Sequence, residues 1–175
     1  MSDTGDKAEA PLVPFHFYRI HVDGSYLTLN TRKGDVRFES DYKGDDKWMQ
    51  RQIWSLEPAD RDKWMFEAAD RDGGLGFQGD NHKTLEQMNS DGGFGFQGEN
   101  HKYLGVNNNG HVGASADTVR GWERFTLEPT QNGYYFVVYW KDSKHYLFKP
   151  PNKIYLEATP HVANATPMTF EDMIP

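Results

Sequence analysis

The chain has 175 residues and no cysteine, and its formal net charge is -7 at pH 7. This charge argues against nucleic acid and anionic membrane surfaces as partners, because both would repel an acidic protein. The lack of cysteine excludes disulfides and thiolate chemistry. Aromatic residues make up 14% of the chain and glycine occurs 17 times, a composition typical of short strands joined by tight turns. We therefore expect one domain dominated by β-structure.

Residues 1–14, MSDTGDKAEAPLVP, are small, charged and proline-containing. We predict a disordered tail there and a folded domain over residues 15–175. The N-terminal segment has no apolar run typical of a signal peptide, and no apolar stretch of the sequence approaches the length of a membrane span. We therefore expect a soluble, cytoplasmic protein.

From residue 15 the sequence has the pattern of short strands separated by turn residues. FHFYRIHV at 15–22 is followed by an Asp-Gly turn signal, and YLTLN at 26–30 alternates apolar and polar residues. Two further strands are predicted in KGDVRFES at 33–40 and RQIWSLEP at 51–58, with at most one helical turn between them. This pattern defines a unit with which the rest of the chain can be compared.

A similar pattern occurs three times. Each unit contains a Tyr-Leu pair, starting at Tyr26, Tyr103 and Tyr146, and then a turn, a strand and a closing segment. The closing segments are IWSLEP at 53–58, RFTLEP at 124–129 and MTFEDM at 168–173. Three four-stranded units of about 40 residues predict an all-β fold, the β-trefoil, in which hairpins close one end of a barrel with pseudo-threefold symmetry. One unit cannot bury its apolar face alone, whereas three around an axis can.

The spacing of the units is uneven, because the first two Tyr-Leu pairs lie nearly two units apart and the last two lie one unit apart. We interpret residues 59–92 as an insertion in or before the second unit. DGGLGFQGDNHK at 72–83 is repeated almost unchanged as DGGFGFQGENHK at 91–102, so the insertion is interpreted as a partial duplication of the strand that opens the second unit. An extra strand could pair with a neighbouring molecule, which would give a homo-oligomer.

KYLGVNNNGHVGASADTVRGWERFTLEP at 102–129 and QIWSLEP at 52–58 resemble the repeat of the fascin-like β-trefoils. That repeat has a Tyr-Leu strand, a glycine turn, a small-residue strand and an aromatic closing strand. The resemblance covers roughly residues 15–173 without the insertion. It implies the same fold and makes actin a candidate partner, while more distant trefoils bind sugars, proteases or growth-factor receptors. The chain differs from the actin-binding relatives in its single trefoil, its 7 His and its acidic charge.

The duplicated motif supplies the residue types of a carbohydrate site, where an aromatic ring stacks on the sugar while amides and carboxylates bind its hydroxyls. The candidate ligand-binding residues are Phe77, Asp80, Asn81 and His82 in the first copy and Phe96, Glu99, Asn100 and His101 in the second. The alternative interpretation is that Phe94 and Phe96 are core residues of a strand and that GENHK is only the turn after it. A recent duplication would also explain why the polar residues match.

Structural explanations are favoured for the other candidate features. The glycine-rich motif resembles a calcium-binding repeat, but Gln78 and Gln97 stand where a ligand Asp would be required, so no metal is expected. VNNNGH at 106–111 is interpreted as a hairpin turn. Trp48 and Trp64 lie in or beside the irregular segments and are the better candidates for exposed aromatic residues, although packing is expected for them too.

No serine-hydrolase, zinc-peptidase or phosphate-loop motif is present in the sequence. We therefore expect no catalytic residues and no cofactor. The sequence predicts a non-catalytic binding module whose first candidate partner is a carbohydrate or glycoprotein. Actin binding and a role as a protein inhibitor or interaction scaffold are the alternatives.

Overall fold

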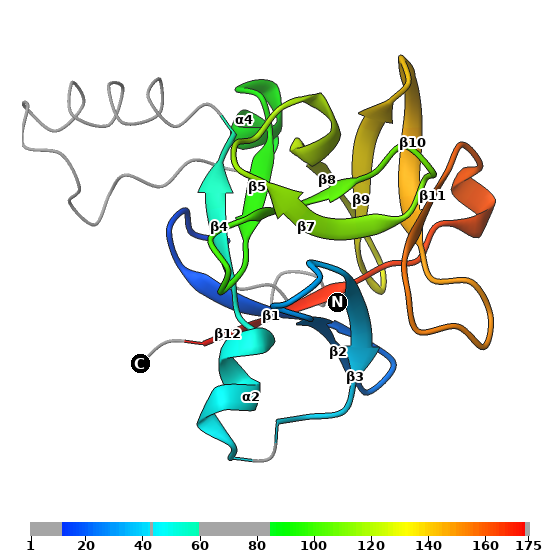
Figure 1. The fold of residues 1–175 in the computed structure, drawn as a ribbon. Coiled ribbons are helices and arrows are strands. Elements are labelled where there is room, and N and C mark those ends of the chain that lie inside the picture. Colours follow the sequence, from blue (N-terminus) through cyan, green and yellow to red (C-terminus); the bar gives the residue numbers. More distant parts are fainter. Residues whose placement is uncertain (1–11, 43, 60–84, 174–175) are drawn as a thin grey trace, which may run out of the picture.

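The computed structural model of the chain describes residues 12–42, 44–59 and 85–173 (Figure 1). The described part contains twelve strands and four short helical segments. The strands are β1 (Phe17–Val22), β2 (Ser25–Leu29), β3 (Val36–Glu39), β4 (Trp54–Pro58), β5 (Phe94–Gln97), β6 (Tyr103–Val106), β7 (Val112–Ala116), β8 (Thr126–Thr130), β9 (Gly133–Trp140), β10 (Ser143–Phe148), β11 (Glu157–Thr159) and β12 (Thr169–Asp172). The helices are α2 (Asp46–Arg51) and α4 (Leu85–Ser90), and the 3-10 turns are η1 (Gly121–Glu123) and η2 (Val162–Asn164).

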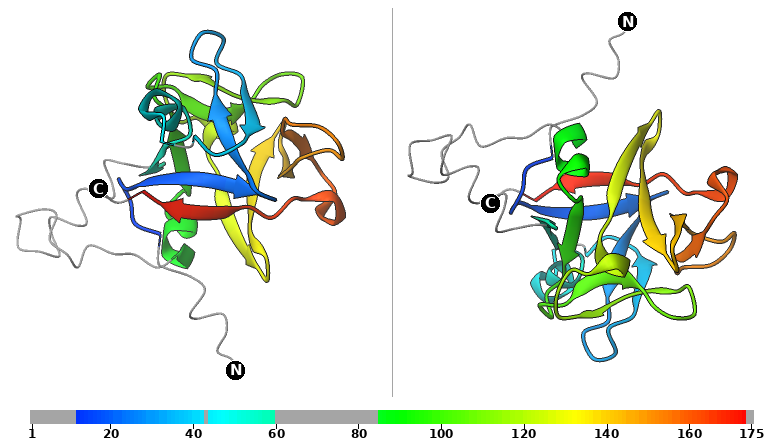
Figure 2. Two further views of the ribbon diagram at one scale, coloured as in Figure 1. Left: turned by 90° about the horizontal axis from the view of Figure 1, so that it is seen from below. Right: turned by 90° about the horizontal axis from the view of Figure 1, so that it is seen from above.

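The strands form three units of four, β1–β4, β5–β8 and β9–β12, which confirms the predicted β-trefoil. The first and last strand of each unit build the barrel: β4 pairs with β5, β8 pairs with β9, and β12 pairs with β1. Bridges from Phe94 to Phe125 and from Tyr134 to Met168 complete the barrel within the second and third units. The hairpins β2–β3, β6–β7 and β10–β11 are the remaining strands. Figure 2 shows β1 and β12, the two ends of the fold, side by side.

The core repeats the threefold pattern at the level of single side chains. Ile20, Phe96 and Phe136 occupy equivalent positions on β1, β5 and β9, and each lies opposite an apolar residue of the neighbouring unit. The ring of Phe96 is fully buried and lies 5.1 Å from that of Phe136, centroid to centroid. Burial of each such side chain stabilises the fold by about 1.5 to 3 kcal/mol. The barrel interior is therefore filled by residues from all three units.

Two glycines allow the strands to approach closely where the second and third units start. Gly93 and Gly133 stand just before Phe94 and Tyr134, with φ angles of +83° and +136°. A Cβ atom on either residue would overlap a backbone carbonyl oxygen, that of Phe125 or that of Met168. Glycine is therefore required at these positions both for its backbone angles and for the space that it leaves.

The described end of the predicted tail belongs to the fold. Leu12 is part of the buried core, and the Val13 N–H donates a hydrogen bond of 2.9 Å to the Tyr18 hydroxyl oxygen. Burial raises the pKa of the Tyr18 hydroxyl, although the hydrogen bond from Val13 opposes this. The described residues before position 15 therefore contact the folded domain, through the core at Leu12 and through the backbone at Val13.

The described end of the predicted insertion is helical. Helix α4 places Met88 in the core, and both ends of the Asn89 amide bind the backbone of Leu127, at 2.9 and 3.0 Å. The helix therefore anchors the start of the second unit to β8. The first copy of the duplicated motif, at 72–83, lies outside the described residues. No described helix is long and apolar enough to cross a membrane.

Helix α2 confirms the helical turn expected between the strands of the first unit. The carboxylate of Asp45 accepts hydrogen bonds from the backbone N–H groups of Lys47 and Trp48, at 3.0 and 3.2 Å. Asp is a favoured residue at this capping position because its oxygen satisfies N–H groups that have no partner within the helix. The helix leads directly into β4.

Candidate functional site

The second copy of the duplicated motif forms β5 and the turn into β6. The turn is closed by backbone hydrogen bonds of 2.9 Å, from Gly98 N–H to Lys102 O and from His101 N–H to Gly98 O. His101 has a φ angle of 63°, in the left-handed region that few residues other than glycine adopt. The side chains of Glu99 and His101 are exposed on this turn. The turn therefore presents two polar groups to solvent.

A cavity of about 500 Å³ lies beside this turn. Its residues come from β1, β4, β5, the turn after β5, the end of α2, and Ile53, which lies between α2 and β4. They are Phe17, Gln50, Ile53, Ser55, Glu57, Gln97, Gly98, Glu99 and His101, and we call this cavity the motif pocket. Phe17 lies opposite Ser55 in the strand register, and Ser55 lies opposite Gln97. Three adjacent strands therefore contribute one continuous row of side chains to the pocket.

Phe17 provides the aromatic surface of the motif pocket. Its side chain is 48% exposed, one of the few large apolar side chains so exposed in the described part of the chain. Its neighbours Tyr18, Ile20 and Val22 are buried, so the alternation along β1 places Phe17 on the outer face of the barrel. That alternation was the available sequence signal for Phe17, which was not among the predicted site residues. A half-exposed ring beside polar groups offers a ligand an apolar face together with hydrogen-bonding partners.

Glu57 and Glu99 supply two carboxylates of different character. The Glu57 side chain is buried, with 9% exposed, and the Tyr103 hydroxyl donates a hydrogen bond of 2.7 Å to its Oε1. The Ser55 hydroxyl lies 3.4 Å from the other oxygen, Oε2. Glu99 is exposed on the turn. The pocket thus combines one carboxylate in a fixed orientation with one that is open to solvent.

The predicted site residues of the second copy have different positions. Glu99 and His101 line the motif pocket. The Asn100 amide donates a hydrogen bond of 3.0 Å to Ala114 O, and its Oδ1 accepts one of 3.0 Å from Lys102 N–H. Asn100 therefore holds the turn against β7.

Phe96 does not line the pocket, because its ring is fully buried in the barrel. The structure thus agrees with the alternative interpretation of this residue as part of the core, and its predicted ligand contact is wrong for the folded chain. Phe77, Asp80, Asn81 and His82 lie outside the described residues, so their part in a site stays a prediction.

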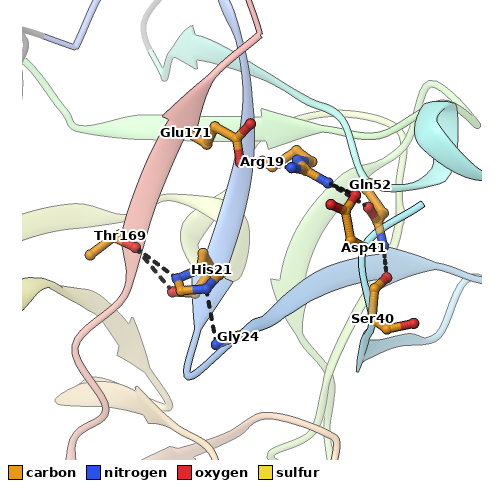
Figure 3. Close-up of polar contacts among 8 residues, drawn as sticks. All are labelled: Arg19, His21, Gly24, Ser40, Asp41, Gln52, Thr169 and Glu171. Carbon is orange, nitrogen blue, oxygen red and sulfur yellow. Dashed lines mark hydrogen bonds and ion pairs between the residues drawn. The ribbon is translucent and has the colours of Figure 1, made fainter. Parts of the chain in front are cut away.

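A second polar cluster surrounds Arg19 on β1 (Figure 3). The guanidinium donates to Asp41 at 2.8 Å, to Gln52 at 3.1 Å and to Glu171 at 2.7 Å. It also stacks over the Tyr26 ring, 3.7 Å from the centroid. Burial lowers the pKa of Arg19, but the hydrogen bonds to both carboxylates outweigh this and raise it above its usual value. This cation is therefore neutralised within the fold, where it joins the first unit to β12.

His21, two residues further along β1, is held in one orientation next to this cluster (Figure 3). Its Nε2 accepts a hydrogen bond of 2.9 Å from Gly24 N–H, and its Nδ1 lies 3.2 Å from the Thr169 hydroxyl oxygen. In this arrangement Nδ1 carries the proton, because Nε2 acts as an acceptor. His21 thus closes the β1–β2 turn against β12.

A smaller cavity of about 290 Å³ lies near the hairpins of the first and second units. It includes Asn107 and His111 of the VNNNGH turn. His111 Nε2 lies 3.0 Å from a Glu157 carboxylate oxygen, and the Trp140 N–H donates a hydrogen bond of 3.0 Å to Asn107 O. These contacts make VNNNGH a structural hairpin turn, as expected. Within the described ranges, no group of three potential metal-ligating side chains comes together.

Comparisons with known proteins identify the fold. No protein-family model matches the sequence, and no curated protein matches it either. Among solved structures, SeviL bound to the asialo-GM1 saccharide has a TM-score of 0.58 and 16% identity, over 91% of this chain and 99% of SeviL. The β-trefoil lectin of the Vibrio vulnificus hemolysin/cytolysin, with N-acetyl-D-lactosamine bound, has a TM-score of 0.55 and 8% identity, over 91% and 97%.

The chain has a β-trefoil fold. The Polyporus squamosus lectin, bound to the epitope Neu5Acα2-6Galβ1-4GlcNAc, is also similar, with a TM-score of 0.57 and 11% identity, although this chain spans only 50% of it. At these identities the likeness establishes the fold alone. The comparisons give no support to the fascin-like family in particular, so that resemblance stays a prediction.

Proposed function

We propose that this trefoil is a non-catalytic carbohydrate-binding protein and that the glycan binds in the motif pocket. The observation that carries the proposal is the half-exposed Phe17 ring, which shares one cavity with the Glu57 and Glu99 carboxylates. The cavity volume, about 500 Å³, lies within the range of about 300 to 1,000 Å³ typical of small-molecule sites.

The pocket offers complementary contacts to the two kinds of surface on a sugar ring. The face of Phe17 can stack on the C–H groups of the ring, while the carboxylates of Glu57 and Glu99 accept hydrogen bonds from hydroxyls. The Gln97 side-chain amide donates a hydrogen bond of 3.1 Å to His101 O, which fixes a further polar side chain at the edge of the pocket. Proteins of similar fold were solved with an asialo-GM1 saccharide and with N-acetyl-D-lactosamine, and such glycans are the first to test.

The test is a glycan array of the full chain and two variants, followed by calorimetry with the best ligand. Phe17→Ala removes the stacking surface, and we expect it to weaken binding about tenfold or more, with little loss of stability for a half-exposed ring. Tyr139→Ala is the matched control, because Tyr139 is 62% exposed on β9 and does not line the pocket. Absence of glycan binding in the folded parent, or equal effects of both substitutions, would contradict the proposal.

Actin binding is the second candidate, and it rests on the resemblance of residues 102–129 to the fascin-like repeat. Co-sedimentation with actin filaments that weakens as salt increases would support it. If the chain stays in the supernatant at low salt while the array reports a glycan, the actin alternative is removed and the carbohydrate proposal stands.

A further inference from the structure

We propose that the motif pocket discriminates by charge, so that it binds neutral glycans and rejects the same glycans when they end in a carboxylate. This inference rests on the proposed function of the pocket and adds the class of ligand. The β-trefoil fold does not by itself impose this preference, since a lectin of similar fold was solved with a sialylated epitope.

The first argument is the charge of the pocket. Its described lining contains two carboxylates, Glu57 and Glu99, and neither lysine nor arginine. His101 is the one lining residue of the described set that could become cationic. Recognition of a ligand carboxylate normally requires an Arg or Lys partner. The pocket therefore offers a negatively charged ligand group no strong counter-charge.

The second argument is that two cations on segments next to the pocket, Arg19 and Lys102, already have carboxylate partners. Arg19, on the same strand as Phe17, binds Asp41 and Glu171. Lys102, at the end of the turn that carries Glu99, forms an ion pair with Asp117. Redirecting the buried Arg19 side chain to a ligand would break both of its ion pairs, whereas the exposed pair of Lys102 costs little to break.

The third argument is that Glu57 cannot easily withdraw from a negatively charged ligand. Its side chain is buried, and the Tyr103 hydroxyl holds Oε1 at 2.7 Å. A carboxylate is an acceptor only, so it suits a ligand hydroxyl and repels a ligand carboxylate. At a separation of several ångströms near a protein surface, one such repulsion reduces affinity about tenfold.

The experiment compares three forms of one glycan on the folded full chain: the neutral form, the form with a terminal Neu5Ac, and the methyl ester of that Neu5Ac. The ester keeps the bulk of the sialic acid and removes its charge. We expect the neutral form to bind at least about tenfold more tightly than the acid. We expect the ester to bind at least about threefold more tightly than the acid.

Two variants locate the effect. Glu99→Gln removes the exposed carboxylate of the pocket. We expect it to reduce the ratio of the affinities for the neutral and the acidic glycan by about threefold. Asp142→Asn is the matched control, because it removes the same charge from the β9–β10 turn, where the backbone has a φ angle of 67° that Asn tolerates. This control should leave the ratio unchanged.

Three results would overturn the inference: equal binding of acid and neutral forms, an ester as weak as the acid, or the same shift in both variants. Failure of the proposed function looks different. In that case none of the three forms binds to the folded parent, and the inference falls with the function on which it rests.

Discussion

The side chains that define the candidate site have roles set by which face of a strand they occupy. Phe96 and Phe17 are both strand phenylalanines, yet Phe96 points into the barrel and is fully buried, whereas Phe17 is 48% exposed. Asn100 and Glu99 are adjacent on one turn, but Asn100 binds Ala114 O while Glu99 faces solvent. Residue type alone could not separate these cases, because the direction of a side chain depends on strand register.

Arg19 is the residue whose contacts most clearly join distant parts of the chain, and it gives the first stability prediction. Arg19→Met keeps much of the apolar stem but leaves Asp41, Gln52 and Glu171 without their shared donor. Because both carboxylates are about half exposed, water can partly compensate, and we expect a loss of about 1 to 3 kcal/mol in the free energy of unfolding.

Urea denaturation measures this loss, and Arg37→Met provides the control. The ion pair of Arg37 with Glu39 lies on the surface, with side chains 47% and 30% exposed. Such a pair contributes at most about 1 kcal/mol, and often much less. Equal losses of unfolding free energy in the two variants would show that the buried contacts of Arg19 stabilise the fold no more than a surface ion pair does.

At the scale of single elements, strands were easier to predict than helices. Apolar alternation and turn residues placed the strands of the first unit: β1, β3 and β4 lie within the expected segments, and β2 starts one residue before its expected segment. Helix α4 was not predicted, because its six residues are too few to show helical periodicity. Its place in the fold depends on tertiary contacts of Met88 and Asn89 that local sequence does not reveal.

The starts of β5 and β9 give a prediction about the barrel itself. Gly93→Ala and Gly133→Ala each place a methyl group against a backbone carbonyl at positive φ. We expect each to reduce the free energy of unfolding by about 2 to 5 kcal/mol, from the combined backbone strain and overlap. Chemical denaturation with an unchanged m-value is the measurement.

Gly24→Ala separates the two contributions. Gly24 has the same φ angle as Gly93, +83°, but nothing lies within 4 Å of an added Cβ. At Gly24 only the backbone strain of a positive φ angle remains, and it should reduce the free energy of unfolding by about 1 to 2 kcal/mol. If Gly24→Ala costs as much as Gly93→Ala, the close approach of the strands is not what requires glycine.

At the scale of the whole molecule, the trefoil could be predicted because its units repeat. Three Tyr-Leu strands and three similar closing segments indicated the architecture, and the structure confirms twelve strands in three units. Of the site, the sequence indicated the turn with Glu99 and His101. It could not bring Phe17 and Glu57 to that turn, since they come from β1 and β4 and meet β5 only through the barrel register.

The most direct test of the central claim is an NMR titration of the isotope-labelled chain with the strongest neutral glycan from the array. The account predicts saturable shifts of backbone amides around Phe17, Ser55 and the Gly98–His101 turn, which surround the motif pocket. Saturable shifts confined to the cavity near the hairpins, around Gly105 and Gly113, would show that a glycan binds but that the motif pocket is not its site.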